Sequence, residues 1–192
     1  GASPKTANLK IALVEGQDLN KPQVQAESTT FSNRCSSLTP GSVKFLNSIG
    51  AWEHITASRV QPYQAMQVWD GVSGSSISFD PSSSSNVSDT VATMTENTNL
   101  TSALLSRLNS LPSIDIMDKT RVEGIELGKE TENMDLSNWP VVSLNNSRKL
   151  AARLLVGADG ANSPVRTFTG IPSRGWDYNR HGLSLIHISE PT

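Results

Sequence analysis

The sequence predicts a mixed α/β fold, α+β in part, and three kinds of segment support that prediction. Residues 9–14 form a short apolar run that is typical of a buried strand. Residues 43–52 and 100–111 place apolar side chains three or four positions apart, which is the spacing of one helix face. Residues 60–79 instead alternate apolar and polar side chains, which indicates strands. The length of 192 residues favours one domain, or two small ones.

The apolar run at residues 9–14 ends in Glu15 and Gly16. An acidic residue at the tip of a strand is what the second strand of a dinucleotide-binding βαβ unit requires, because its carboxylate accepts hydrogen bonds from ribose hydroxyls. A Gly-rich phosphate loop should then lie about 20 residues upstream, but no G-x-G-x-x-G pattern precedes Glu15. A Glu with a structural role alone is the alternative.

A polar loop follows, and residues 36–42 are expected to open the first helix. Thr39 is a suitable N-cap, and Pro40 suits the first helical position because its missing N–H costs nothing there. Gly50 is expected to end the helix at its C-terminus. Cys35 is expected to be a small buried residue rather than a reactive thiol. The expected core stripe of this helix consists of Val43, Leu46, Ile49 and Trp52.

The elements after residue 60 alternate between strand and helix patterns. A hairpin is expected where Met66 and Val68 face Ile77 and Phe79 across a turn at residues 70–74. A Ser-rich stretch at 81–88 predicts a solvated loop. A second helix is expected from a leucine stripe with capping candidates at residues 97–99 and Pro112 beyond its end. The stripe of this helix consists of Leu100, Leu104, Leu108 and Leu111.

The rest of the chain is expected to form mainly strands. Strands are expected at residues 114–117 and 121–127, followed by a loop at 128–140. A hairpin of 141–144 with 149–153 and a buried strand at 154–156 are expected after it.

Composition excludes several classes of function. The chain contains 28 Ser and 15 Thr, and its net charge of −2 gives no general attraction to nucleic acid. One Cys and three His allow no disulfide framework and no zinc-binding spacing. A run of about 20 apolar residues, which a membrane-spanning helix needs, is absent from the sequence. Composition therefore identifies no function, and the prediction of function depends on local motifs.

The most informative motif is the stretch from Arg153 to Arg166, in which an apolar run enters Gly157-Ala158-Asp159-Gly160. Its glycines permit close approach of the backbone to a ligand. Ser163 and Pro164 are typical of a helix start, and an Asp beside a helix N-terminus can hold hydroxyl and phosphate groups of a dinucleotide. A merely structural turn is the alternative for a generic Gly-Asp-Gly motif.

On this stretch the chain resembles the FAD-dependent aromatic-ring hydroxylases of the para-hydroxybenzoate hydroxylase-like group. Within that group it is most similar to the ubiquinone-biosynthesis monooxygenases, particularly the fungal mitochondrial enzyme. Further matching stretches follow the order of the family and together span nearly all of residues 9–182. They are residues 10–16, 33–34, 36–40, 49–52, 59–63, 66–71 and 175–178.

The resemblance implies a fold and a set of cofactor contacts. The fold would be a partial FAD-binding Rossmann-like domain interleaved with a β-sheet substrate domain. Catalytic side chains and metal ligands are not implied, since the flavin carries the reactive group. The implied FAD contacts are Glu15 on the adenosine ribose, Arg34 near the pyrophosphate, Asn97 on the flavin nucleotide, Asp159 and Gly160 along the cofactor, and Arg166 fixing the turn or the cofactor region.

The resemblance also implies an activity for the parent protein. FAD and O2 would hydroxylate the ring of a polyprenylated benzoate or phenol in ubiquinone biosynthesis, through a flavin hydroperoxide. Electrons would arrive from ferredoxin and its reductase, and other ubiquinone-biosynthesis proteins would be partners. The enzyme would lie peripherally on the matrix side of the mitochondrial inner membrane. The alternatives are an NAD(P)H-dependent FAD hydroxylase of a soluble aromatic compound and a non-catalytic truncated product.

The expected organisation is that of a fragment. The FAD-binding domain would comprise residues 1–58 and 96–170, and the substrate domain 59–95 and 171–182. Residues 183–192 match the translation of a common sequencing adapter and are expected to be foreign. The first Gly-rich loop would lie upstream and a later Gly-Asp motif downstream. Residues 1–182 alone are therefore expected to be poorly stable and to bind no FAD.

Overall fold

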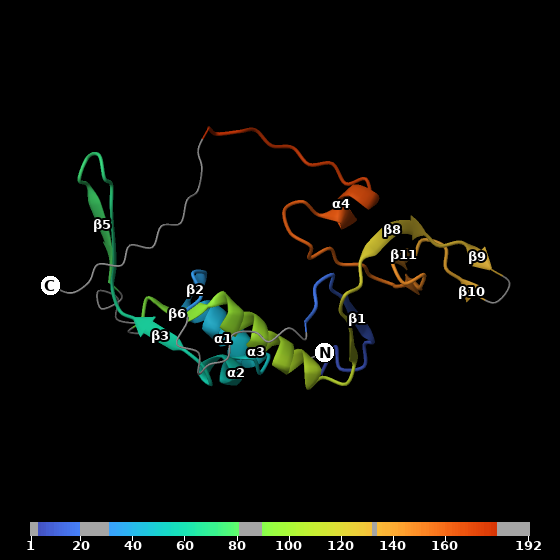
Figure 1. The fold of residues 1–192 in the computed structure, drawn as a ribbon, viewed down its shortest axis with the longest axis horizontal. Helices are drawn as coiled ribbons and strands as arrows, with labels where there is room; N and C mark the ends of the chain where they lie inside the picture. The colour runs from blue at the N-terminus through green and yellow to red at the C-terminus, as the bar shows by residue number, and fades with distance from the viewer. Residues whose placement is uncertain (1–3, 20–30, 81–89, 132–133, 180–192) are drawn as a thin grey trace. The chain divides into compact units, whose positions relative to one another are not determined.

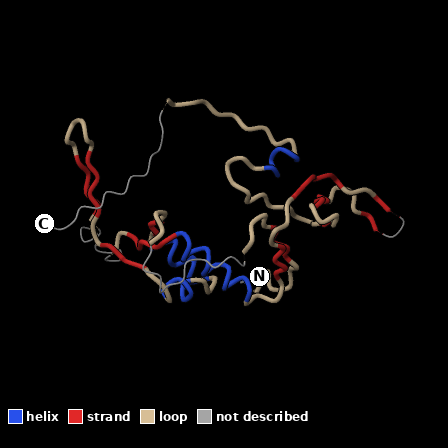
Figure 2. Tube along the Cα trace, in the orientation of Figure 1, coloured by secondary structure: helices blue, strands red, loops and turns tan. Residues whose placement is uncertain are grey.

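The computed structural model describes residues 4–19, 31–80, 90–131 and 134–179. The chain divides into two compact units, the first made of Gly1–Ile11 and Lys21–Asp115 and the second of Ala12–Asn20 and Ile116–Thr192 (Figure 1). The first unit contains the helices α1 (Pro40–Ser48), α2 (Trp52–Thr56) and α3 (Asn97–Asn109), and the second contains α4 (Pro164–Phe168). Figure 2 shows the helices in blue and the strands in red. The predicted mixture of helix and strand is confirmed.

Strands β1 (Ile11–Val14) and β7 (Ile114–Met117) pair, and the division between the units falls within both of them. The Ile11 N–H donates to the Ser113 carbonyl, and the Glu15 N–H donates to the Met117 carbonyl. Residue numbers rise together along both strands, so the two strands are parallel. Both predicted strands are confirmed, but the expected burial of the first is wrong. Ile11 and Leu13 are each 37% exposed, because in the described residues β1 has a single neighbouring strand.

The first unit contains a three-stranded antiparallel sheet with β6 at its centre. Its strands are β2 (Cys35–Leu38), β6 (Ala92–Glu96) and β3 (Val60–Tyr63), in that order. The prediction that residues 36–38 open a helix is wrong, because their backbone pairs with β6 and the helix begins only after Thr39.

Three helices pack beside this sheet, namely α1 (Pro40–Ser48), α2 (Trp52–Thr56) and α3 (Asn97–Asn109). The predicted start of α1 is confirmed, because the Thr39 hydroxyl accepts from the Ser42 N–H at 3.3 Å. Gly50 has a φ of +72°, so the chain turns there and Trp52 lies in α2 rather than α1. The buried core residues between the helices are Leu46, Ala51, Ile55 and Ala103.

Replacing Thr39 with alanine is expected to lower the free energy of unfolding by about 1 kcal/mol, because the side-chain acceptor for the first turn of α1 is lost. Chemical denaturation of the two proteins measures the difference. Thr39→Ser keeps a hydroxyl and is the matched control, so equal losses in the alanine and serine variants would contradict the capping role.

The predicted hairpin is formed by β4 (Met66–Trp69) and β5 (Ser76–Phe79), which pair antiparallel. Its turn is closed by the Asp70 N–H, which donates to Ser75 at 2.8 Å, and by the Asp70 carboxylate, which accepts from the Ser73 N–H at 2.6 Å. This carboxylate has a lowered pKa because of its hydrogen bonds to Ser73. The Ser-rich stretch at 81–88 lies outside the described residues.

The second unit contains the antiparallel sheet β12–β11–β8, with β8 (Val122–Leu127), β11 (Pro140–Leu144) and β12 (Lys149–Ala151). The predicted β11–β12 hairpin is confirmed. The segment expected to be a loop contains the short paired strands β9 (Glu130–Thr131) and β10 (Met134–Asp135). The strand predicted at 154–156 is wrong. In the described part of the chain these residues pair with no strand, and Leu154 and Val156 are 78% and 71% exposed.

Candidate functional site

Arg34 and Asn97 meet where β2 lies beside the start of α3. The Asn97 N–H donates to the Arg34 carbonyl at 2.9 Å, and the Ser36 hydroxyl donates to the Asn97 side-chain oxygen. Two candidates 63 positions apart in the sequence are therefore neighbours. The expectation that residues 97–99 cap α3 is wrong, because Glu96 occupies the N-cap position and its side chain makes no capping bond.

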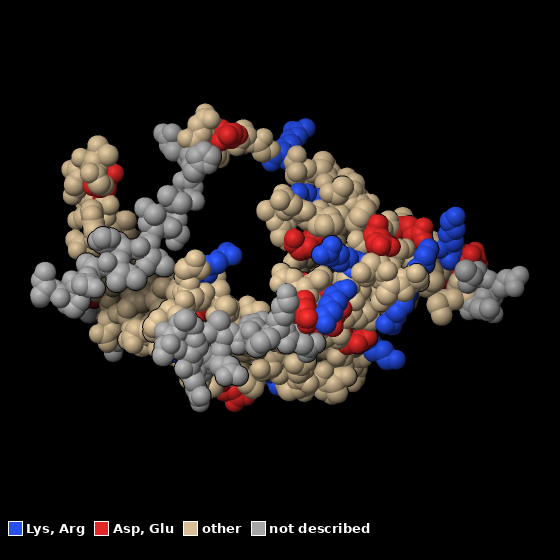
Figure 3. Space-filling view, viewed as in Figure 1, with Lys and Arg blue, Asp and Glu red and all other residues tan. Residues whose placement is uncertain are grey.

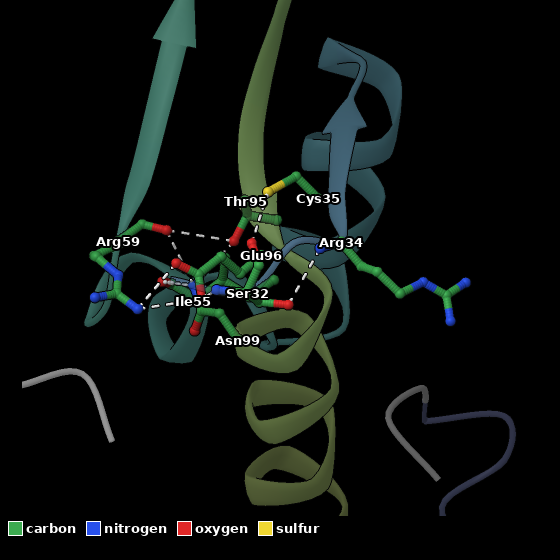
Figure 4. Close-up of polar contacts among 8 residues, drawn as sticks. All are labelled: Ser32, Arg34, Cys35, Ile55, Arg59, Thr95, Glu96 and Asn99. Carbon is green, nitrogen blue, oxygen red and sulfur yellow. Dashed lines mark hydrogen bonds and ion pairs between the residues drawn. The ribbon is translucent and has the colours of Figure 1, made fainter. Parts of the chain in front are cut away.

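The Arg34 side chain extends away from the polar contacts around Glu96 (Figure 4). Its backbone N–H donates to the Ser32 hydroxyl at 3.3 Å, whereas the described residues give its guanidinium no hydrogen bond or ion pair. A guanidinium is suited to bidentate contact with phosphate, and α3 is a 13-residue helix whose N-terminus carries a partial positive charge. This end of the first unit suits an anionic group.

Cys35 is exposed, so the expectation that it is buried is wrong. It is the first residue of β2, where exposed and half-buried positions alternate along the strand, and it occupies the exposed side. Its sulfur lies 4.0 Å from the Ser32 carbonyl oxygen.

Glu15 lies in the second unit, directly after β1. Its carboxylate accepts from the Gln17 N–H at 2.8 Å, and its carbonyl accepts from the Thr120 N–H at 3.0 Å. The neighbouring turn is held by an ion pair of 3.0 Å between Lys119 and Asp18, and the hydrogen bond to Asp18 raises the pKa of Lys119. Glu15 is half-buried and fixed at the strand end that the sequence assigned to it.

Asp159 and Arg166 are brought together by the turn that begins α4 (Pro164–Phe168). The Ser163 hydroxyl donates to one oxygen of the Asp159 carboxylate, and the Val165 N–H donates to the other at 2.9 Å. The Arg166 guanidinium donates to the Ala161 carbonyl at 2.9 Å, so its described contact fixes the turn. The predicted helix start at Ser163 is confirmed, since its hydroxyl accepts from the Arg166 N–H.

The glycines of this motif have different roles. Gly160 has a φ of +86°, a conformation that L side chains rarely adopt, and a Cβ built on it would meet open space. A Cβ on Gly157 would lie 3.0 Å from a Val165 methyl carbon, so this glycine permits close packing within the turn. Among the described residues, Glu15 makes no hydrogen bond or ion pair with this turn.

Replacing Asp159 with asparagine is expected to loosen the first turn of α4 at neutral pH. The hydrogen bonds from Ser163 and Val165 lower the pKa of Asp159, so the stabilisation is present above the pKa of an unfolded Asp, about 3.9, and is lost as pH falls through the lower native pKa. Hydrogen exchange of the Val165 amide, followed against pH, should differ between wild type and variant at pH 7 and converge under acid conditions.

The exposed Asp115→Asn serves as the matched control for this measurement and should leave exchange at Val165 unchanged at every pH. A difference between wild type and Asp159→Asn that persists undiminished in acid would contradict the role of the carboxylate charge.

The remaining surface offers few other candidates. Acidic and basic side chains are interspersed on the face drawn in Figure 3. Within the described residues, no three His, Cys, Asp or Glu side chains gather to bind a metal ion, and none of the helices is long and apolar enough to cross a membrane. A shallow cavity of about 380 Å³ lies against α1 in the first unit and includes none of the predicted site residues. Its lining includes Pro40, Val43, Lys44, Asn47, Trp52 and Thr93.

The Arg34–Asn97 contact in the first unit and the Asp159 turn in the second each offer groups that suit part of a dinucleotide. Residues 24–190 match the family model described as FAD binding domain, and the chain belongs to this family. Two curated relatives are named ubiquinone biosynthesis monooxygenase COQ6, mitochondrial. The one from Danio rerio is 36% identical over all of this chain and 39% of its own length, and the one from Saccharomyces cerevisiae is 37% identical over 94% and 37%. The chain thus spans about two fifths of the relatives it matches.

Solved structures share the fold. PqsL, a probable FAD-dependent monooxygenase from Pseudomonas aeruginosa, aligns with a TM-score of 0.63 at 20% identity, over 88% of this chain and 41% of its own. The p-nitrophenol 4-monooxygenase PnpA from Pseudomonas putida aligns with a TM-score of 0.63 at 17% identity, over 86% and 38%. The predicted fold class, that of the para-hydroxybenzoate hydroxylase-like enzymes, is confirmed.

The residues present fit FAD, the cofactor of the family. The exposed guanidinium of Arg34, whose backbone carbonyl is bound to the first residue of α3, suits a pyrophosphate, and the half-exposed Glu15 suits a ribose. Sequence reasoning missed one feature of this region, the ion pair between Arg59 and Glu96, whose oxygen and nitrogen atoms approach to 2.9 Å. Glu96 directly precedes the expected helix, but its partner lies 37 positions earlier and no local pattern links the two.

Proposed function

We propose that the whole protein containing this chain is a FAD-dependent monooxygenase that hydroxylates the aromatic ring of a polyprenylated benzoate or phenol intermediate in ubiquinone biosynthesis. The observation that carries the proposal is the 36% identity to a ubiquinone biosynthesis monooxygenase along the entire chain. The fold shared with FAD-dependent monooxygenases supports the same reaction class.

In this proposal the chain supplies cofactor contacts rather than reacting groups. Arg34 and the start of α3 hold the pyrophosphate, Asn97 holds the flavin nucleotide, and Glu15 holds the adenosine ribose. Asp159, Gly160 and Arg166 form a turn along the cofactor. The chemistry that bound FAD supplies is insertion of one oxygen atom of O2 into an aromatic C–H bond. The tasks of the protein are then to bind, to orient and to exclude water.

The domain organisation expected from the sequence is part of the proposal. Residues 1–58 and 96–170 belong to the FAD-binding domain, and 59–95 and 171–182 to the substrate domain. Residues 183–192, which lie outside the described part of the chain, are a foreign adapter translation.

The proposal extends to the location and the partners of the whole protein. The relatives carry the word mitochondrial in their names, and we place the whole protein on the matrix side of the inner membrane, attached peripherally, where its polyprenylated substrate resides. Ferredoxin with its reductase is the electron donor, and other ubiquinone-biosynthesis proteins are partners.

Turnover by the whole protein tests the proposal. Purified protein with FAD, O2, ferredoxin, ferredoxin reductase and NADPH is expected to add one oxygen atom to a short-chain prenylated hydroxybenzoate, detected by mass spectrometry. NADPH without the ferredoxin system is expected to support little oxidation. Efficient NADPH oxidation with a soluble phenol and no ferredoxin would favour the alternative hydroxylase. Absence of FAD binding by the whole protein would favour a non-catalytic product.

A further inference from the structure

Glu96 has an unusual position for a buried carboxylate. It is the N-cap residue of α3 and only 8% exposed, yet its side chain makes no capping bond to the helix. Its two oxygens instead lie 2.9 Å and 3.2 Å from the Arg59 guanidinium, and the second also accepts from the Ser32 N–H at 3.3 Å (Figure 4). The negative charge of Glu96 at the start of α3 is therefore paired with Arg59 and hydrogen-bonded to Ser32, which lies just before β2.

The same contacts hold the turn that carries Arg34. The Arg59 guanidinium lies 4.5 Å from the centre of the Phe31 ring, and Glu96 binds the next residue, Ser32. The Ser32 hydroxyl accepts from the Arg34 N–H, and the Arg34 carbonyl accepts from Asn97. Residues 31–34 are thus fixed at both ends, by the Arg59–Glu96 pair at one end and by the first residue of α3 at the other.

The charge balance of the Arg59–Glu96 pair affects how a phosphate group can approach the start of α3. A carboxylate at a helix N-terminus that lacks its own cation would repel a phosphate group approaching the same end. With Arg59 bound to Glu96 the two charges cancel, and the Arg34 side chain extends away from Glu96 rather than pairing with it (Figure 4). The guanidinium of Arg34 is then left for a ligand.

We propose that Arg59 and Glu96 are positioning residues for the FAD pyrophosphate. Glu96 holds the turn that presents Arg34, and Arg59 cancels the charge of Glu96 at the helix end. The proposal rests on the proposed function, in which Arg34 contacts the pyrophosphate. It assigns no contact with FAD to either member of the pair.

Ligand binding by the whole apoprotein tests the pair, with FAD and with riboflavin, which lacks the pyrophosphate. Arg59→Met is expected to raise the dissociation constant for FAD about tenfold, because the Glu96 charge is left uncompensated. The value for riboflavin should change by less than about twofold, because riboflavin has no phosphate to be repelled. Flavin fluorescence quenching measures both constants, and the effect on FAD should shrink at high salt.

Two further variants control for misfolding, because removing Arg59 leaves the buried Glu96 carboxylate without its cation, which also destabilises the fold. Arg59→Lys keeps the positive charge and is expected to bind FAD within about threefold of wild type. The double variant Arg59→Met/Glu96→Gln leaves no charge behind and is expected to bind FAD more tightly than Arg59→Met alone. This double variant remains informative even if the single variant does not fold, since its FAD affinity should then approach that of wild type.

Three results would overturn the inference. The first is an unchanged FAD affinity in Arg59→Met, and the second is an equal loss of affinity for FAD and for riboflavin in that variant. The third is a double variant that binds FAD as weakly as Arg59→Met does but binds riboflavin normally. A wild-type protein that binds no FAD would instead overturn the proposed function, so the two failures are distinguishable.

Discussion

Replacing Arg34 with alanine is expected to raise the dissociation constant of the whole protein for FAD by about 10- to 100-fold, the loss of one hydrogen bond to a charged group. The physical reason is that Arg34 is exposed and that its guanidinium has no hydrogen bond or ion pair within the described residues, while its carbonyl is held by the first residue of α3. A titration of apoprotein with FAD, followed by flavin fluorescence, measures the change.

Two variants make the Arg34 result specific. Arg34→Lys keeps the charge but loses the planar fork that binds phosphate through two parallel bonds, so an intermediate affinity is expected. Arg148→Ala removes an exposed arginine from the turn between β11 and β12 and should leave the affinity unchanged. Wild-type affinity in Arg34→Ala would show that this side chain does not contact the cofactor.

The features that the sequence predicted correctly depend on neighbours along the chain. The starts of α1 and α4 follow from Thr39 with Pro40 and from Ser163 with Pro164, and each cap closes onto a backbone N–H three residues later. The two hairpins follow from alternating strands on either side of a short polar turn. In each case the residues that determine the structure lie within one turn or one hairpin.

The features that the sequence did not reveal depend on partners far along the chain. Strand β6 reads Ala-Thr-Met-Thr-Glu, which has little apolar alternation, and it forms because β2 and β3 pair with its two edges. Residues 154–156 show the opposite case, an apolar run without a pairing strand among the described residues. A strand pattern predicts a strand only where another strand supplies its hydrogen bonds.

The candidate site divides in the same way. The Asp159 turn could be predicted from its own motif, because its contacts stay within eight residues of one another. Arg34 and Asn97 could be named only through the family resemblance, and their contact needs the β2–β6 pairing. The Arg59–Glu96 pair has no local signal, so the structure was needed to find it.

Replacing Ile55 with alanine is expected to have the largest effect on stability, a loss of about 2–5 kcal/mol in the free energy of unfolding. Ile55 is 0% exposed and packs in the core formed by Leu46, Ala51 and Ala103. Truncation removes buried apolar area and leaves a cavity that rigid neighbours fill only in part. Urea denaturation, followed by the fluorescence of the tryptophans, measures the loss.

Ile77→Ala is the matched control, because Ile77 lies in β5 and is 58% exposed. The same atoms are removed from a side chain that water already contacts, so a loss below about 1 kcal/mol is expected. Equal losses at the two positions would contradict the burial of Ile55. The Ile55 carbonyl also accepts from the Asn99 side chain at 3.1 Å, and the alanine variant keeps this backbone acceptor, so the expected loss measures the burial of the side chain alone.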